Sequence, residues 1–262
     1  MQIQQIRNAT QRITYADKTF LIDPWLAPKG TSGCFRDFPY RPVDPAQEDI
    51  AMPMCELPMS IEAVLSGIDA YIVTHVHPDH IDMTPDGRLG NHLDKTLPIF
   101  VQNQADADAF SASGFADVRL LSQDCFFEDI ALIQTPGLHG TETPCGPSCG
   151  VIFKHPNEKT LYVAGDTIWY DGVLKTLQQF EPQVITLNAC AAELQGYGRL
   201  IMDDADVESV VRHAGNASIV ITHMDNVAHA SITRDSMRKR LSRRALLDRV
   251  LMPEDGETLQ FC

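Results

Sequence analysis

A dense group of metal-ligand side chains directly after an apolar run is the feature that most limits how this chain can fold. The run is Ala70–Val73, and after Thr74 the sequence continues His75-Val76-His77-Pro78-Asp79-His80. In an extended segment, residues two positions apart point to the same side, so His75 and His77 can reach one metal ion. Without an ion, imidazoles gathered so closely would compete for protons and be costly to bury. The segment therefore predicts a metal site at the end of a strand.

Pro78 divides this segment into two parts. A proline ends a strand and suits the first turn of a helix, so the chain changes direction at this point. The change of direction lets Asp79 and His80 face a second ion beside the first. The segment thus predicts two adjacent metal positions.

Three further metal-ligand residues stand where strands are expected to end. His139 comes shortly after an apolar run, Asp166 follows Leu161-Tyr162-Val163-Ala164-Gly165, and His223 follows Ile219-Val220-Ile221-Thr222. Proteins with mixed sheets commonly assemble their sites from side chains at the carboxyl ends of strands. We expect these three residues to join the earlier segment in one crevice.

Short apolar runs alternate with helical patterns along the chain. The runs predict strands at Ile13–Tyr15, Phe20–Ile22, Ala70–Val73, Ile99–Val101, Val118–Leu121, Ala131–Ile133, Val151–Phe153, Leu161–Val163, Val184–Leu187 and Ile219–Thr222. Helices are predicted at Ile61–Leu65, Ala105–Ala112, Val173–Phe180, Ala205–His213 and Ile232–Val250. This alternation predicts an α/β sandwich, and because no Pro/Ser-rich linker divides the chain we expect one domain over residues 1–262.

Two segments of the sequence resemble each other. Residues 17–23 and residues 158–166 both read as a turn, a buried strand and an aspartate at the end of that strand. Two copies of a strand-rich half, packed sheet to sheet, would give this pattern. A chance similarity between two hairpins is the alternative.

Charge and composition exclude several classes of protein. The chain has 21 basic and 35 acidic side chains, a net charge of −14, which disfavours a nucleic-acid-binding face. No window holds the roughly 18 apolar residues that a membrane-spanning helix needs, and the N-terminus lacks the apolar run of a secretory signal. The seven cysteines are scattered, and Cys145 and Cys149 read either as a redox pair or as two loop thiols. We therefore expect a cytoplasmic protein that binds neither nucleic acid nor membrane.

The ordered set of metal-ligand residues resembles the metallo-β-lactamase superfamily over nearly the whole chain. Within it, the chain is similar to the branch that includes the L-ascorbate-6-phosphate lactonases, with supporting matches at Phe20-Leu21-Ile22-Asp23-Pro24 and Thr222-His223-Met224-Asp225. The resemblance implies a four-layer αββα sandwich with the site at one edge of the two sheets. It also implies a ligand set for two metals: His75, His77 and His139 for one, Asp79, His80 and His223 for the other, and Asp166 as the bridge.

Two departures narrow the activity that this resemblance implies. Many metallo-β-lactamases have a cysteine where this chain has Asp166, which argues against β-lactam hydrolysis. The flavodiiron branch has an acidic residue where this chain has His77, which argues against the reduction of oxygen or nitric oxide.

The implied activity is hydrolysis by a dinuclear centre. Two divalent ions would generate a bridging hydroxide that cleaves a small ester, a lactone or a phosphorylated metabolite. Nitrogen and oxygen donors admit zinc, manganese or iron, and the resemblance makes zinc or manganese the expected metal. Asp79 would orient the hydroxide, and His229 is the candidate for a proton donor or substrate contact. A phosphodiesterase is one alternative, and a non-catalytic metal-binding sensor or scaffold is another.

Residues around the site have predicted supporting roles. We expect Asp23 to hold the far nitrogen of a ligand histidine, and Asn188 either to do the same or to satisfy a loop. The basic run from Arg234 to Arg249 reads either as the solvated face of a helix or as an attractor for an anionic substrate or a partner subunit. The expected partner is thus a small molecule, with an anionic substrate and a homo-oligomer left open.

Overall fold

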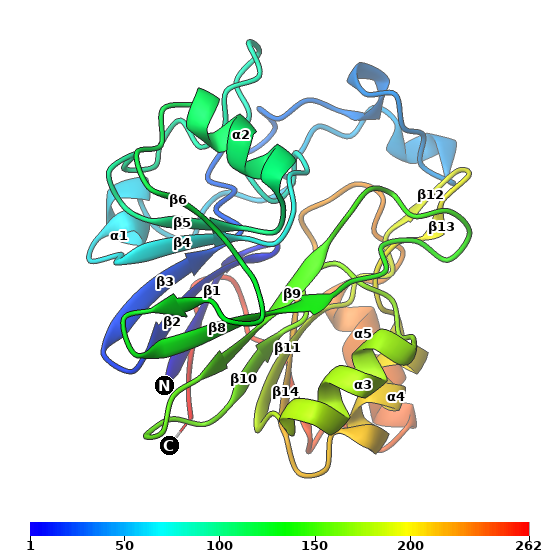
Figure 1. Ribbon diagram of the computed structural model, residues 1–262. Coiled ribbons are helices and arrows are strands. Elements are labelled where there is room, and N and C mark those ends of the chain that lie inside the picture. The colour runs from blue at the N-terminus through cyan, green and yellow to red at the C-terminus, as the bar shows by residue number, and fades with distance from the viewer. Residues whose placement is uncertain (262) are drawn as a thin grey trace.

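Two seven-stranded sheets face each other in the computed structural model, which describes residues 1–261 (Figure 1). In spatial order, the first sheet is β16 (Thr258–Gln260), β1 (Gln2–Arg7), β2 (Thr10–Tyr15), β3 (Lys18–Ile22), β4 (Ala70–Val73), β5 (Ile99–Val101) and β6 (Val118–Leu120). The second sheet is β15 (Val250–Leu251), β14 (Ser218–Thr222), β11 (Val184–Asn188), β10 (Leu161–Val163), β9 (Cys149–Lys154), β8 (Ile130–Pro136) and β7 (Phe126–Phe127). A separate hairpin consists of β12 (Glu193–Leu194) and β13 (Gly198–Arg199).

The two sheets repeat the same pattern of strand directions. In the first sheet the pairs from β16 to β3 are antiparallel, and the pairs from β3 to β6 are parallel. In the second sheet the pairs from β7 to β10 are antiparallel, and those from β10 to β15 are parallel. The strands β3 and β10 therefore occupy equivalent places in their sheets. Each is followed by the aspartate that ends one of the two similar sequence segments, residues 17–23 and residues 158–166. This agreement favours two related halves over a chance similarity of hairpins.

Helices cover the outer face of each sheet. The helices α1 (Ile61–Leu65) and α2 (Gln104–Ala112) lie on the first sheet. The helices α3 (Asp171–Phe180), α4 (Asp204–His213) and α5 (Arg234–Arg243) lie on the second (Figure 1). Alternation along β3 shows why: Phe20 and Ile22 face the other sheet, whereas Leu21 faces the helices. The predicted four-layer αββα sandwich is confirmed.

Most of the predicted strands and helices are present, whereas several short strands, among them β7, β12 and β13, were not predicted. The strands at residues 70–73, 99–101 and 161–163 and the helix at residues 61–65 have the predicted bounds. The helix predicted at Ile232–Val250 is wrong beyond residue 243, because Ala245 adopts a left-handed φ of 56° and the chain then enters β15. The sequence reading missed β1, whose glutamines hide its apolar alternation. In residues 1–261, no helix has both the length and the apolar character needed to cross a membrane.

Phe20 tests the core between the sheets. Its side chain is fully buried, and its ring lies 5.1 Å from that of Phe153 and 5.4 Å from that of Phe127, measured between centroids. We expect Phe20→Ala to lower the free energy of unfolding by about 3–5 kcal/mol, because the cavity cannot collapse between two sheets. Phe126→Ala, at a position 57% exposed in the same region, should change it by less than about 0.5 kcal/mol. Urea denaturation in excess chelator measures the free energy of unfolding of both variants. Equal decreases for Phe20→Ala and Phe126→Ala would show that Phe20 is not a core residue between the sheets.

Candidate metal centre

All seven predicted ligands lie in loops at the same edge of the two sheets. The segment from His75 to His80 follows β4, His139 follows β8, Asp166 follows β10 and His223 follows β14. Parallel strands end at one edge of a sheet, and the two sheets bring their edges together, so residues far apart in sequence meet there. The structure brings together every residue of the predicted set.

Three overlapping groups of these side chains have the geometry to hold a metal ion. The groups are His75, His77 and His139; His75, His80 and Asp166; and Asp79, His80 and His223, and within each group the ligand atoms lie within 4.8 Å of one another. The first and third groups match the two predicted metal positions. Asp166 lies between them, with Oδ2 at 3.3 Å from His80 Nε2 and 3.8 Å from His75 Nε2.

Four of the five ligand imidazoles are held from behind through Nδ1. Asp23 Oδ2 lies 2.9 Å from His80 Nδ1, and the Leu200 carbonyl lies 3.1 Å from His139 Nδ1. Thr74 Oγ1 lies 3.2 Å from His75 Nδ1, and Cys190 Sγ lies 3.6 Å from His223 Nδ1. Such contacts fix the orientation of a ring and leave Nε2 free for a metal.

The free ring nitrogens fit a cation. His75 Nε2 and His139 Nε2 are buried without a hydrogen-bond partner in the described chain, which is costly for a polar atom unless a ligand satisfies it. His80 Nε2 and His223 Nε2 lie 3.3 Å apart, so a hydrogen on both nitrogens would clash and at least one of them must present a lone pair. The donor set and its orphaned atoms therefore fit the divalent metals that the fold implies.

The protonation of the cluster also fits a cation. Burial lowers the pKa of His75 well below its usual value and that of His77 to about 4, so both are neutral imidazoles with a lone pair to donate. Burial would raise the pKa of Asp166, but His80 and His223 hold it well below the usual range. Burial likewise opposes charge on His80, yet Asp166, Asp23 and Asp79 raise its pKa to about 10. The buried carboxylates thus need positive charge beside them, which a metal supplies as well as protons do.

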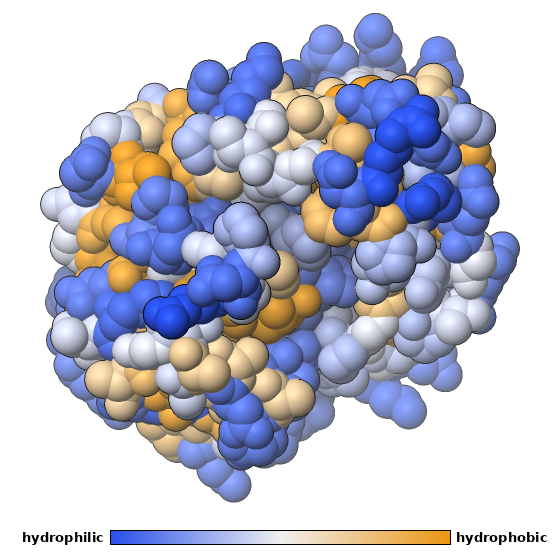
Figure 2. Space-filling view, turned by 90° about the horizontal axis from the view of Figure 1, so that it is seen from above, coloured by the Kyte–Doolittle hydropathy of each residue, from blue (hydrophilic) through white to orange (hydrophobic). Residues whose placement is uncertain are grey.

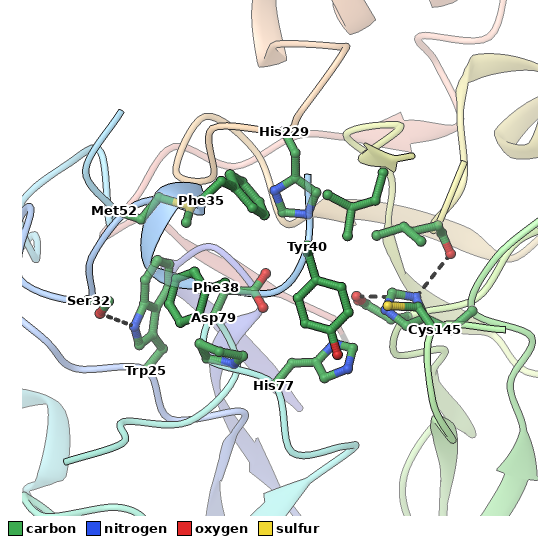
Figure 3. Close-up of a pocket in the computed structure, with 15 residues that line it drawn as sticks. Trp25, Ser32, Phe35, Phe38, Tyr40, Met52, His77, Asp79, Cys145 and His229 are labelled. Carbon is green, nitrogen blue, oxygen red and sulfur yellow. Dashed lines mark hydrogen bonds and ion pairs between the residues drawn. The ribbon is translucent and has the colours of Figure 1, made fainter. Parts of the chain in front are cut away.

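A small cavity opens onto this centre. It has a volume of about 60 Å³, and His77, Asp79, His139, Asp166 and His229 form its polar side. Figure 3 shows Asp79 and His77 at the middle of the lining, with Trp25 to one side and Cys145 to the other. His229, the candidate proton donor, is therefore in place: its ring packs edge-on against Phe35 with centroids 5.0 Å apart, and its Nδ1 is buried without a partner in residues 1–261.

The supporting residues expected from the sequence have specific contacts. Asp23 accepts hydrogen bonds from Thr74 N and Thr74 Oγ1, at 2.7 and 2.8 Å, besides holding His80. Asn188 Nδ2 donates to Asp166 Oδ1 at 2.5 Å, so this amide orients the carboxylate between the metal groups rather than a histidine. The positioning role predicted for Asp23 matches this geometry.

Asn8 is a supporting residue that sequence reasoning missed. Its Nδ2 lies 3.2 Å from His223 Nε2 and donates to the Asp79 carbonyl at 3.0 Å, and its own carbonyl accepts from His223 N. Asn8 has a left-handed φ of 52°, which asparagine adopts more readily than most residues. The turn between β1 and β2 therefore contacts the metal centre. In the sequence, the only signal for this contact is an asparagine shortly before an apolar strand.

Two further predictions concerned residues outside this cluster. The basic run on and after α5 is largely paired with acids: Arg234 contacts Asp225 and Asp255 at 2.9 Å each, and Arg244 contacts Asp204 at 2.7 Å. Cys145 and Cys149 are both free thiols, and only Cys145 lines the cavity.

Comparisons with known proteins agree with this fold and site. No protein-family model matches the chain. Among solved structures, a possible metal-dependent hydrolase from Veillonella parvula is 38% identical with a TM-score of 0.91, and the isothiocyanate hydrolase from Delia radicum gut bacteria is 34% identical with a TM-score of 0.90. Each match covers 100% of this chain and 99% of the other. The metallo-β-lactamase fold protein YhfI from Bacillus subtilis, 14% identical with a TM-score of 0.61 over 99% of both chains, shares the fold.

The chain is therefore a metal-dependent hydrolase of the metallo-β-lactamase superfamily. Within it, the chain belongs to the UPF0173 family, being 42% identical over 265 residues to the UPF0173 protein YddR of Bacillus subtilis, with all of both sequences covered. The narrower similarity to the ascorbate-phosphate lactonases stays a prediction.

Asp23 gives a test of metal binding that needs no substrate. Asp23→Asn removes the charge behind His80, so we expect metal affinity to fall by about 10–100-fold. Competition with a fluorescent chelator measures the affinity, and Asp17→Asn, in the exposed turn before β3, is the control. Equal affinities for the two variants would show that Asp23 does not orient a ligand.

Proposed function

We propose that this protein binds two divalent ions and hydrolyses a small molecule at an electrophilic carbon. The convergence of seven metal-ligand side chains at one sheet edge carries the proposal. In this assignment His75, His77 and His139 would hold one ion, Asp79, His80 and His223 would hold the other, and Asp166, which lies between the two groups, would be the shared ligand. Nitrogen and oxygen donors without a thiolate admit zinc, manganese or iron, and the resemblance to the metallo-β-lactamase superfamily favours zinc or manganese.

The bound ions would lower the pKa of water towards neutrality and polarise the substrate. The chain's own residues provide the geometry for this chemistry. Asp79 lies beside the cavity with Oδ2 3.2 Å from His223 Nε2, so its carboxylate is placed to accept a hydrogen bond from the attacking water. Asn188 keeps Asp166 in one orientation through its 2.5 Å hydrogen bond. No serine or cysteine nucleophile is needed for this reaction.

An isothiocyanate is the first substrate to test. A structural neighbour 34% identical over the whole chain is named isothiocyanate hydrolase, and the central carbon of that group is strongly electrophilic. Water adds to this carbon, and cleavage of the carbon–nitrogen bond then releases a primary amine and carbonyl sulfide. A lactone, an aryl ester and bis(p-nitrophenyl) phosphate complete the panel, because a two-metal centre serves carbonyl and phosphoryl substrates alike.

The metal content and Asp166 together test the proposal. We expect protein purified without chelators to contain about two equivalents of zinc or manganese and to hydrolyse at least one carbon-centred substrate of the panel. Asp166→Asn should lose one equivalent and at least about 100-fold in kcat/KM, since the residue contacts both metal groups. Elemental analysis and steady-state kinetics measure these effects, with Asp171→Asn at the exposed start of α3 as the control.

Two results would overturn the proposal. Turnover of the phosphodiester alone would make the protein a phosphodiesterase. A fully metallated protein that turns over nothing in the panel, and whose Asp166→Asn variant loses only stability, would be a metal-binding sensor or scaffold.

His229 is the group that we propose to exchange a proton with the substrate. Its ring lines the cavity but lies outside the metal groups, and Nδ1 has no hydrogen-bond partner in the described chain. We expect His229→Gln to lower kcat by about 100-fold or more while metal content stays at the wild-type level. His155→Gln, on the far side of the molecule beside Asp129, is the control. An unchanged kcat would reduce His229 to a packing residue.

A further inference from the structure

The part of the cavity away from the metal groups is formed by apolar side chains. It is lined by Trp25, Phe35, Phe38, Tyr40, Met52, Leu194 and Leu200, and we call the first four of these the aromatic wall. The face seen in Figure 2 is hollowed near its middle, with hydrophobic residues inside the hollow. An apolar surface that a compact protein leaves open beside its reactive groups is typical of a ligand site.

The lining of the cavity offers no positively charged partner to an anionic substituent. In residues 1–261, no lysine or arginine lines the cavity, although its polar side holds the carboxylates Asp79 and Asp166. The basic run that was a candidate anion attractor is paired with acids, as Arg234 and Arg244 illustrate. A carboxylate or phosphate placed against the wall would lose its hydration without gaining a cationic partner.

The size of the cavity limits the group that fits. A volume of about 60 Å³ is roughly four to six times the 10–15 Å³ that one water needs by the same measure. This room suits a single ring or a short branched alkyl chain.

The wall is held in place before any ligand arrives. Arg7 is fully buried and donates to the carbonyls of Trp25 and Ala27 at 2.9 and 2.8 Å, and the Asp82 carboxylate accepts from Leu26 N and Ala27 N. The Trp25 ring is fixed by its Nε1, which donates to Ser32 Oγ at 3.0 Å (Figure 3). A preformed wall costs a ligand little ordering, so most of the apolar contact contributes to affinity.

The other end of the wall is fixed in a similar way. Arg41 NH1 donates to the carbonyls of Phe35, Phe38 and Tyr40, at 3.0, 2.6 and 2.7 Å. The Tyr40 ring packs edge-on against Tyr197 in the loop between β12 and β13, with centroids 5.8 Å apart. Both ends of the wall therefore have defined positions.

We propose that the aromatic wall is a binding site for an uncharged apolar substituent of the substrate, of the size of one aromatic ring, and that it discriminates against substituents that carry a carboxylate or phosphate. The proposal rests on the proposed function, because it places the reacting carbon at the metal groups and the substituent against the wall. It identifies the substrate class as small neutral compounds with one apolar group.

A binding experiment tests this proposal without any turnover. The chain has two tryptophans, so Trp169→Phe leaves Trp25 as the reporter of the cavity. The fluorescence of the metallated variant is titrated with N-benzylacetamide and with N-acetylglycine, which differ only in a phenyl ring against a carboxylate. We expect the phenyl compound to bind at least about tenfold more tightly. Equal affinities, or tighter binding of N-acetylglycine, would overturn the proposal even if hydrolysis is confirmed.

Substitution of Phe38 then locates the binding. Phe38 is half-buried, so its truncation leaves the core intact. We expect Phe38→Ala to weaken N-benzylacetamide binding about tenfold and to raise KM for benzyl isothiocyanate by the same factor, because both compounds would lose the same ring contact. Phe126→Ala, exposed and outside the cavity, is the matched control. If Phe38→Ala binds N-benzylacetamide as tightly as the wild type does, the phenyl group binds elsewhere and the proposal for the aromatic wall is wrong. If the protein binds N-benzylacetamide selectively but hydrolyses no compound of the panel, only the proposed function is wrong.

Discussion

The metal centre depends on hydrogen bonds that fix four of its histidine rings, each through the ring nitrogen that faces away from the centre. Asp23, Thr74, Leu200 and Cys190 each occupy that position behind a different histidine. An imidazole ring that was free to rotate could form other hydrogen bonds. Its Nε2 would then no longer face the other ligands of the centre. Because every anchor comes from a strand end or the loop after it, the sandwich must be complete before the centre exists.

Charge balance is the second requirement of the centre. Asp166 is buried and Asp79 is half-buried, yet both carboxylates are ionised, and such carboxylates persist only beside positive charge. The neutral His75 and His77 supply lone pairs on one side, while His80 lies among three carboxylates on the other. The cluster therefore combines the ligands and the charge that divalent metals require.

The sequence predicted the metal-ligand residues better than their surroundings. Strand ends and short-range spacing identify His75, His139 and His223, because the side chain that follows a buried strand has a defined direction. Asn8 and Arg7 could not be found this way, since each acts through backbone groups distant in sequence. The cavity was also hidden: the segment from residue 27 to residue 58 has little regular structure, so no periodicity shows which of its aromatic residues face inwards.

Arg41 secures the segment that faces the substrate through main-chain carbonyls alone. Carbonyls are present whatever the side chain, so the half-buried residues 38 and 40 can be exchanged while their backbone keeps these hydrogen bonds. Selection can therefore alter which compounds are accepted while the ion-holding residues stay untouched.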